Sequence, residues 1–171
     1  MNEIISISIT DGTVIEPVTL QEAKAWIRVD GTDDDLIIAL LITQARMAVE
    51  SYTCCSLVSK DIECIANVDS LFELPHGPID GTVKINDEDA EPSATTGTDF
   101  IKIVGVRGKV KLNYSVGYDP IPGQLKVAVL NEIAYRYQNR GDQVKEITLG
   151  SNYLCESSIH LCQPFKRMSW L

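Results

Sequence analysis

The chain has 171 residues and a mass of 18.9 kDa, which suffices for one domain or for one domain with a small subdomain. Hydrophobic residues make up 44% of the sequence and charged residues 23%, proportions that exclude a disordered chain, a collagen-like repeat and a disulfide-dense miniprotein. The 24 acidic residues outnumber the 15 Lys and Arg residues and give a net charge of −9. A field of this sign does not favour binding to the phosphate backbone of DNA.

The N-terminus and the cysteines bear on the cellular compartment. The first residues lack a basic segment followed by an apolar one, so we expect no secretory signal. The longest nearly apolar run, residues 36–42, is too short to cross a bilayer. The cysteines number five, which is odd, and we expect free thiols in a reducing compartment. The sequence therefore predicts a soluble, intracellular protein without a membrane partner.

A first helix is predicted at residues 19–30. Thr19 and Glu22 have the spacing of a capping box, in which each side chain binds a backbone amide of the other residue. Gly31 is expected to end the helix. The face predicted to enter the core carries apolar residues at helical spacing, namely Leu20, Ala23, Trp26 and Ile27.

A second helix is predicted at residues 33–53. It opens on three acidic residues, 33–35, at the end where the helix dipole favours carboxylates. We therefore interpret them as capping residues rather than as a cation site. Apolar residues then recur every three or four positions, and the stripe expected to face the core consists of Leu36, Ile37, Leu40, Leu41, Ala45, Ala48 and Tyr52.

Residues 57–118 are predicted to form a small antiparallel sheet of four or five strands. One strand alternates polar residues with apolar ones, which are Val110, Leu112, Tyr114 and Val116. The other expected strands lie at residues 61–66, 83–85 and 101–103. We expect a hairpin turn at Arg107-Gly108 and loops at residues 75–78 and 87–97, which are rich in turn-forming residues.

A third helix is predicted at residues 122–140, ending at Gly141. The residues beyond it have no clear periodicity, yet they include Leu154, Leu161, Phe165, Trp170 and Leu171. A segment this apolar is expected to fold back on its own domain or to dock on a partner. The predicted fold class is α+β: a helical body of two N-terminal helices and one long C-terminal helix, an inserted small antiparallel β-sheet and an extended C-terminal tail.

Few residues indicate site chemistry. Cys155, His160 and Cys162 place three possible zinc ligands within a short segment, but the paired cysteine knuckles of structural zinc sites are missing. Neither a phosphate-binding glycine loop nor a nucleophile elbow occurs. We therefore expect no catalytic residue, no metal and no cofactor. A metal-dependent or thiol enzyme built on these three residues stays as one alternative.

Several motifs, in their order and spacing, resemble one family. They are Glu16-Pro17-Val18-Thr19-Leu20-x-Glu22-Ala23-Lys24, Arg28-Val29-Asp30, Asp33-Asp34-Asp35, Val49-Glu50-x-Tyr52-Thr53, Leu74-Pro75-x-Gly77-Pro78-Ile79, Val110-x-Leu112-x-Tyr114-x-x-Gly117-Tyr118 and Tyr137-x-Asn139-Arg140. Together they cover about residues 16–141. This combination resembles the head–tail connector family of tailed double-stranded DNA phages, the adaptor or head-completion proteins that lie beneath the portal.

The resemblance implies a structural virion protein of the phage neck, present in the host cytoplasm during assembly. It implies one connector domain at residues 1–141 and a C-terminal tail at residues 142–171. The subunits would form a homo-oligomeric ring, commonly a 12-mer, that binds the portal protein, extends the DNA channel and receives the downstream neck or tail protein. DNA would pass without sequence-specific binding, because acidic subunits repel its phosphates.

Two groups of residues are candidates for interaction. Arg136 and Arg140 share one face of the third helix and are expected at a subunit or channel face. The tail residues expected to dock between portal subunits are Phe165, Lys166, Arg167, Trp170 and Leu171. The alternative outside phages is a non-viral protein-binding adaptor module without catalytic activity.

Overall fold

The structure, a computed structural model, describes residues 3–11, 15–86, 88–90, 93–94, 101–140 and 154–167. The chain divides into two compact units, each built from two separate segments. A sheet unit combines Met1–Ile15 with Val58–Asp119, and a helical unit combines Glu16–Leu57 with Pro120–Leu171. The α+β class is confirmed. No helix among the described residues combines the length and the apolar character that crossing a membrane requires.

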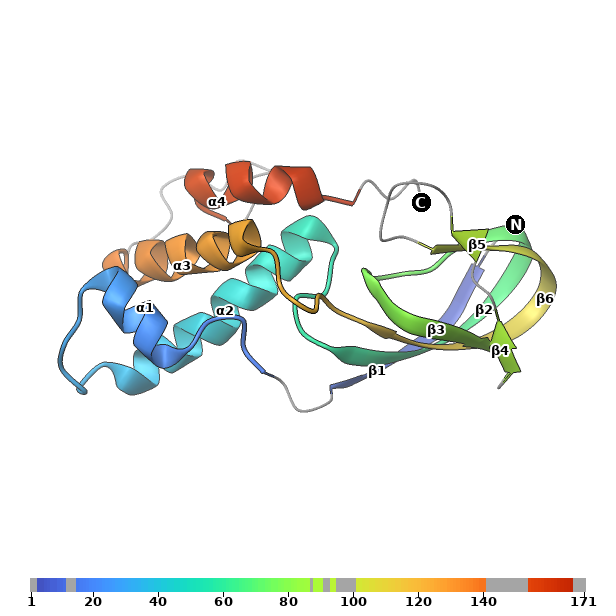
Figure 1. Ribbon diagram of the computed structural model, residues 1–171, viewed down its shortest axis with the longest axis horizontal. Coiled ribbons are helices and arrows are strands. Elements are labelled where there is room, and N and C mark those ends of the chain that lie inside the picture. The colour runs from blue at the N-terminus through green and yellow to red at the C-terminus, as the bar shows by residue number, and fades with distance from the viewer. Residues whose placement is uncertain are drawn as a thin grey trace. The chain divides into compact units, whose positions relative to one another are not determined.

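The helical unit contains α1 (Leu20–Ile27), α2 (Asp35–Thr53), α3 (Gly123–Gln138), α4 (Glu156–Cys162) and the 3-10 turn η1 (Gln163–Phe165). The long helices α2 and α3 pack against each other, and α1 contacts both of them (Figure 1). Helix α4 lies along α3 on its other side. The three helices predicted from periodicity are confirmed with their ends shifted by at most three residues, as is usual for helix termini.

The capping box predicted at the start of α1 is present. The Glu22 amide donates to Thr19 Oγ1 at 3.2 Å, and the Glu22 carboxylate accepts from the Thr19 amide at 2.7 Å. The bond from the Thr19 amide lowers the pKa of Glu22, because it stabilises the ionised carboxylate. The helix ends before Gly31: Arg28 adopts the left-handed conformation, with φ 58°, and its amide binds the Lys24 carbonyl.

The buried face of α2 differs from the predicted one. It consists of Ile38, Leu41, Ile42, Ala45, Arg46, Val49 and Thr53. Leu36, Ile37 and Leu40, which were expected in the core, are 87%, 41% and 59% exposed. The helix carries apolar residues on two opposite faces, and only one of them meets α1 and α3. Trp26 of α1 was also expected inside and is 47% exposed.

The sheet unit contains six antiparallel strands among its described residues. They are β1 (Glu3–Asp11), β2 (Lys60–Glu73), β3 (Ile79–Ile85), β4 (Glu88–Ala90), β5 (Ser93–Ala94) and β6 (Ile101–Val116). The strand order is β1-β2-β6-β3-β4, with β5 paired to β6 (Figure 1). Strand β1 lies N-terminal to the predicted sheet region and was not predicted.

The sheet core follows the predicted alternation. Every second residue of β6 from Val110 to Val116 is buried, and these side chains pack with Ile62 and Cys64 of β2. Burial raises the pKa of the Cys64 thiol. The hairpin turn expected at Arg107-Gly108 is absent, because β6 continues through both residues and pairs them with β2. Gly108 has a φ of +97° and provides an irregularity inside the strand instead of a turn.

Two of the motifs meet within the sheet unit. The hydroxyl of Tyr114 donates to the Pro75 carbonyl at 2.7 Å, and the Gly117 amide donates to the Pro78 carbonyl at 2.9 Å. Gly117 has a φ of +139°, and a Cβ at this position would lie 2.8 Å from the Val58 carbonyl oxygen. Only glycine satisfies both conditions, which explains this residue at the end of β6.

Candidate functional site

The described part of the helical unit contains three clusters of polar side chains that join segments distant in sequence. Most of the polar or charged side chains that are buried in this unit belong to them or bind beside them; the buried set is Arg46, Thr53, Ser56, Glu132, Ser158 and Arg167. A buried polar group destabilises a fold unless it is hydrogen-bonded, so such clusters define how the segments fit together. They also contain many of the residues that form the sequence motifs.

The first cluster surrounds Arg46 on α2. Its Nε donates to Glu16 at 2.8 Å, and its Nη1 donates to Glu50 at 2.9 Å. The other oxygen of Glu16 accepts from Thr43, and the other oxygen of Glu50 accepts from the Leu57 amide. Burial disfavours the charged guanidinium, but the two carboxylates outweigh this effect and raise the pKa of Arg46. The cluster therefore attaches Glu16, which precedes α1, and Leu57, which follows α2, to side chains of helix α2.

The second cluster joins the acidic motif at residues 33–35 to the last motif of the series. Tyr137 on α3 donates its hydroxyl proton to the carboxylate of Asp34, and Arg140 Nη1 lies 3.4 Å from the other Asp34 oxygen. The guanidinium of Arg140 also stacks 4.1 Å from the centre of the Tyr137 ring. The hydroxyl bond and the Arg140 charge lower the pKa of Asp34, and the same bond raises the pKa of Tyr137.

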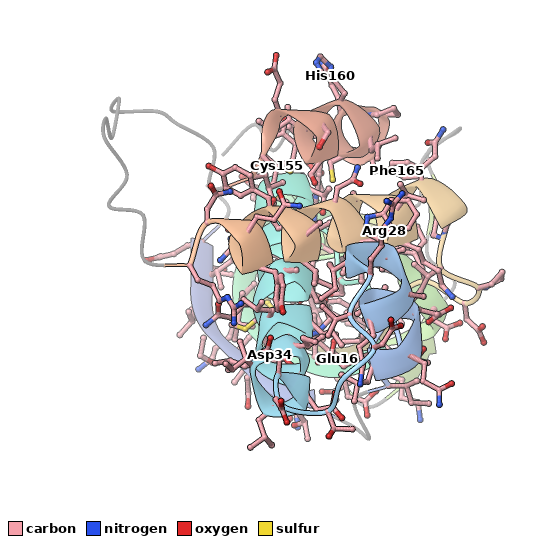
Figure 2. All side chains as sticks on the ribbon, turned by 90° about the vertical axis from the view of Figure 1, so that its left-hand side faces the viewer. Glu16, Arg28, Asp34, Cys155, His160 and Phe165 are labelled. Atoms are coloured by element: carbon pink, nitrogen blue, oxygen red, sulfur yellow. The ribbon has the colours of Figure 1, made fainter. Side chains whose placement is uncertain are left out.

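This cluster corrects part of the capping interpretation. Asp34 is the N-cap residue of α2, yet its side chain makes no capping bond, because it binds α3 instead (Figure 2). Asp35 lies in the first turn, as expected for a carboxylate near a helix N-terminus. It forms an ion pair with Lys24 of α1 at 2.6 Å. The acidic run therefore joins three helices rather than capping one.

The third cluster attaches the C-terminal segment to α3. Glu132 is 1% exposed, and its carboxylate accepts from Arg136 Nε at 2.8 Å and from the Cys155 amide at 2.9 Å. Ser158 of α4 donates to the carbonyl of Ala128 on α3. The segment expected to be an extended tail therefore contains a helix that folds back on the chain, and Glu132 holds its first residue in place.

The residues predicted for interaction make contacts within the chain. Arg136 and Arg140 both form intrachain ion pairs, in which their side chains remain 28% and 43% exposed. The Arg167 amide donates to the Thr53 carbonyl at the end of α2, and Lys166 Nζ lies 4.6 Å from the centre of the Tyr52 ring. Trp170 and Leu171 lie outside the described residues.

Phe165 also contributes to the contact between η1 and the end of α2. Its carbonyl accepts from the Cys55 thiol at 3.5 Å, and its own position is marked in Figure 2. Arg167 beside it is only 8% exposed. The described part of the tail is thus bound to the helical unit at both of its ends.

The three possible zinc ligands do not form a site. Within the described ranges, no group of three His, Cys, Asp or Glu side chains has the arrangement to hold a metal ion. Cys162 is buried, while His160 is exposed and points away from α4 into solvent (Figure 2). Burial, the charge of Glu132 and the neighbouring Cys155 raise the pKa of the Cys162 thiol to about 12. A thiol held protonated in this way is a poor nucleophile and a poor metal ligand.

Sequence reasoning missed Glu132, and it missed the partners of Glu16 and Arg46. The spacing Glu132–Arg136 is the ordinary signal of an ion pair along a helix, but nothing in the sequence indicates that the carboxylate is buried. It also missed an exposed apolar stripe on α2, formed by Leu36, Ile37, Leu40 and Met47. The signal for that stripe was present, since α2 has more apolar residues than one buried face can use.

Comparison with protein families identifies a class. Residues 17–89 match the model of the family described as phage gp6-like head-tail connector proteins. This range includes the capping box, the acidic run, Arg46 and the loop at residues 75–78. The resemblance to phage head–tail connector proteins is therefore confirmed. No protein with a curated description matches the chain in sequence.

Comparison with solved structures extends the likeness to nearly the whole chain. A chain in the structure "Neck of empty GTA particle computed with C6 symmetry" is 14% identical, with a TM-score of 0.68 over 96% of this chain and 97% of that one. A chain in "Virion of native gene transfer agent (GTA) particle" is 17% identical, with a TM-score of 0.67 over 95% and 97%. A third, in "Neck of native GTA particle computed with C12 symmetry", is 16% identical, with a TM-score of 0.58 over 96% and 97%. The fold is thus one also found in chains of gene transfer agent particles.

Proposed function

We propose that the chain is a structural protein of the neck of a phage or phage-like particle, where it connects the head to the tail. The observation that carries this proposal is the agreement of two independent comparisons. The family match covers residues 17–89 in sequence, and the fold likeness to chains of GTA neck and virion structures covers at least 95% of the chain.

The role is structural rather than catalytic in this proposal. The polar side chains that catalysis would require are engaged in holding segments together: Arg46 binds two carboxylates, Glu132 binds Arg136 and a backbone amide, and Asp34 binds α3. Such groups are satisfied by the fold and do not converge on a common open site. A connector requires this kind of rigidity, because it transmits the position of one ring to the next.

The working state in this proposal is a ring, commonly of twelve copies, that docks on the portal and extends the DNA channel. Two of the similar structures are necks computed with C6 and C12 symmetry, and a ring is the closed form of a repeated head-to-tail contact. The net charge of −9 per copy suits a channel wall, since accumulated negative charge repels phosphates and lets DNA slide without sequence-specific contacts.

The tail is proposed to contribute to portal docking through Lys166, which is exposed beside Tyr52. Phe165 and Arg167 act first within the chain, through their contacts with the end of α2. A Lys166→Glu substitution tests docking: it removes the contact of Lys166 with the Tyr52 ring but keeps the bonds that the Phe165 and Arg167 backbones make at the end of α2. It is expected to weaken capture of the chain by portal-bearing heads, whereas Lys84→Glu on the sheet unit leaves capture unchanged.

Disrupting the gene in the genome that encodes the chain tests the neck role directly. The expected result is an accumulation of DNA-filled heads without tails, seen by electron microscopy of lysates, and recovery of tailed particles when the intact chain is supplied from a plasmid. Tailed, infectious or transducing particles formed in its absence contradict the proposal and favour a protein-binding adaptor outside the particle.

A further inference from the structure

Helix α2 has two apolar faces, and the chain covers only one of them. Four side chains on the uncovered face form what we term the α2 stripe: Leu36, Ile37, Leu40 and Met47, which are 87%, 41%, 59% and 57% exposed. At about 100° per residue, Leu36, Leu40 and Met47 lie on the side of the helix opposite Ile38 and Val49, which are fully buried. An exposed stripe of this kind on a helix indicates an interaction surface.

The α2 stripe carries no charge. Between Leu36 and Ser51, the exposed residues of the helix are Leu36, Ile37, Ala39, Leu40, Gln44, Met47 and Ser51. In a chain with 24 acidic and 15 basic residues, an uncharged surface of this length is unusual. A partner recognised through DNA phosphates or through basic residues would require charged groups here, and none lies on this face.

A second copy of the chain fits these properties. Two copies with a net charge of −9 repel each other wherever their charged surfaces meet, so their contact is most favourable where both are uncharged. The stripe supplies four large apolar side chains that are between 41% and 87% exposed. A standard interface takes about 800 Å² from each partner. Neighbouring polar surface would supply the remainder.

A groove in the same unit can receive the stripe of a neighbour. It has a volume of about 390 Å³ and lies between α1 and the start of α2, with apolar lining from Leu20, Ala25 and Val29. Its polar lining consists of Gln21, Lys24, Asp30 and Asp35. Lys24 and Asp35 neutralise each other in an ion pair, and Asp30 is an exposed carboxylate. Asp35 is about 100–160° around the helix from the stripe residues. The stripe and the groove are thus different surfaces on different sides of α2.

We propose that the α2 stripe of one copy packs into the α1–α2 groove of the next, and that this contact is the subunit interface of the ring. The inference rests on the proposed function for its ring. Because the two surfaces differ, the contact is heterologous, and its repetition closes into a ring when the rotation between copies permits. Leu36, the most exposed residue of the stripe, and Leu40 would enter the groove, where the neighbour's Leu20 and Val29 exclude water from them.

Sedimentation velocity of the purified full-length chain over a range of concentrations tests the interface. The wild-type chain is expected to associate as the concentration rises. Leu40→Glu is expected to raise the dissociation constant by at least about tenfold, because the contact would bury an unpaired carboxylate. Tyr135→Glu is the matched control: its side chain is 52% exposed on α3, outside the stripe and the groove, and association should be unchanged. Circular dichroism checks that both variants fold.

A photo-cross-linking residue, p-benzoylphenylalanine, in place of Leu40 identifies the contact on the second copy. The expected product is a cross-linked dimer whose adduct maps to residues 20–29. A wild-type chain that stays monomeric at all concentrations and yields no cross-link overturns the inference. So do oligomers that Leu40→Glu leaves intact. Neither result bears on the gene-disruption experiment, which tests the neck role by itself, so the two failures are distinguishable.

Discussion

The helical unit and the sheet unit reach stability by different means. All buried polar or charged side chains of the described residues belong to the helical unit, whereas the sheet core consists of apolar residues with Cys64 and Tyr114. In a sheet, the hydrogen bonds between strands satisfy the backbone polar groups and fix the register. The alternation of apolar and polar residues along each strand then determines which side chains enter the core. A helix satisfies its backbone hydrogen bonds internally, so these bonds do not fix its position against a neighbouring helix. In the helical unit, the polar clusters specify how the helices pack.

Among the substitutions that test this contrast between the units, Arg46→Met is expected to cause the largest loss of stability. The substitution removes the guanidinium that pairs with both Glu16 and Glu50, in a cluster where the Arg46 side chain is 9% exposed. Removing one partner of a buried ion pair costs about 3–5 kcal/mol of unfolding free energy. Denaturant unfolding followed by far-UV circular dichroism, which reports on helices and strands alike, should detect this loss.

Its control is Lys111→Met in the sheet unit. Lys111 pairs with Glu63 at 2.9 Å, with side chains 40% and 46% exposed, and such surface pairs contribute at most about 1 kcal/mol. Equal losses in the two variants would show that the Arg46 cluster is no more than a surface feature, and the contrast between the units would fail.

Gly117→Ala is expected to have the next largest effect, and on the sheet unit. A φ of +139° disfavours any side chain, and the new Cβ would lie 2.8 Å from a backbone oxygen that cannot easily move. We expect a loss of about 2 kcal/mol, in the range of strained backbone positions. Thermal unfolding provides the measurement. Gly31→Ala, where nothing lies within 4 Å, is the comparison and should stay within about 0.5 kcal/mol of wild type.

The smallest effect is expected for Asp34→Asn, and it depends on pH. The pKa of Asp34 is lower in the folded chain, so its contribution to stability is present above the unfolded value of about 3.9 and is lost as pH falls through the folded value. Wild type should therefore be more stable than Asp34→Asn at pH 7, and the difference should shrink below about pH 4. Unfolding curves over this range measure it; a constant difference would contradict the assigned role.

Tyr137→Phe removes the same hydrogen bond from its donor side. The folded chain raises the pKa of Tyr137, so the stabilisation is complete below the unfolded value of about 10 and is lost as pH rises through the folded one. The Asp34 and Tyr137 variants should lose similar stability at neutral pH, and the double variant little more, because they remove one shared hydrogen bond.

Features that depend on neighbours in sequence could be predicted. The capping box of Thr19 and the alternation from Val110 to Val116 are local, and both are confirmed. The choice between the two apolar faces of α2 is not local, since it depends on where α1 and α3 pack. Strand β1 was within reach, because Ile5, Ile7 and Ile9 alternate with polar residues, but its partners in β2 lie 49 to 64 residues further along the sequence.

The polar clusters likewise could not be predicted from local sequence. Arg46 and Glu16 are thirty positions apart, and Tyr137 and Asp34 are 103 apart, so no spacing rule relates them. Motif resemblance named Glu16, Asp34 and Tyr137 without explaining them. The structure supplies the reason for Asp34 and Tyr137, which lie in different motifs and are partners in space.

The division of the chain has a consequence for how it can be cut and rebuilt. Both units are assembled from two segments, so the backbone passes from one unit to the other three times, near residues 15, 57 and 119. A single proteolytic nick at any of these crossings leaves at least one unit composed of two separate chains that noncovalent contacts must hold together. Conversely, residues 58–119 begin and end at crossings, so this segment can change in length over evolution while both halves of the helical unit keep their sequence.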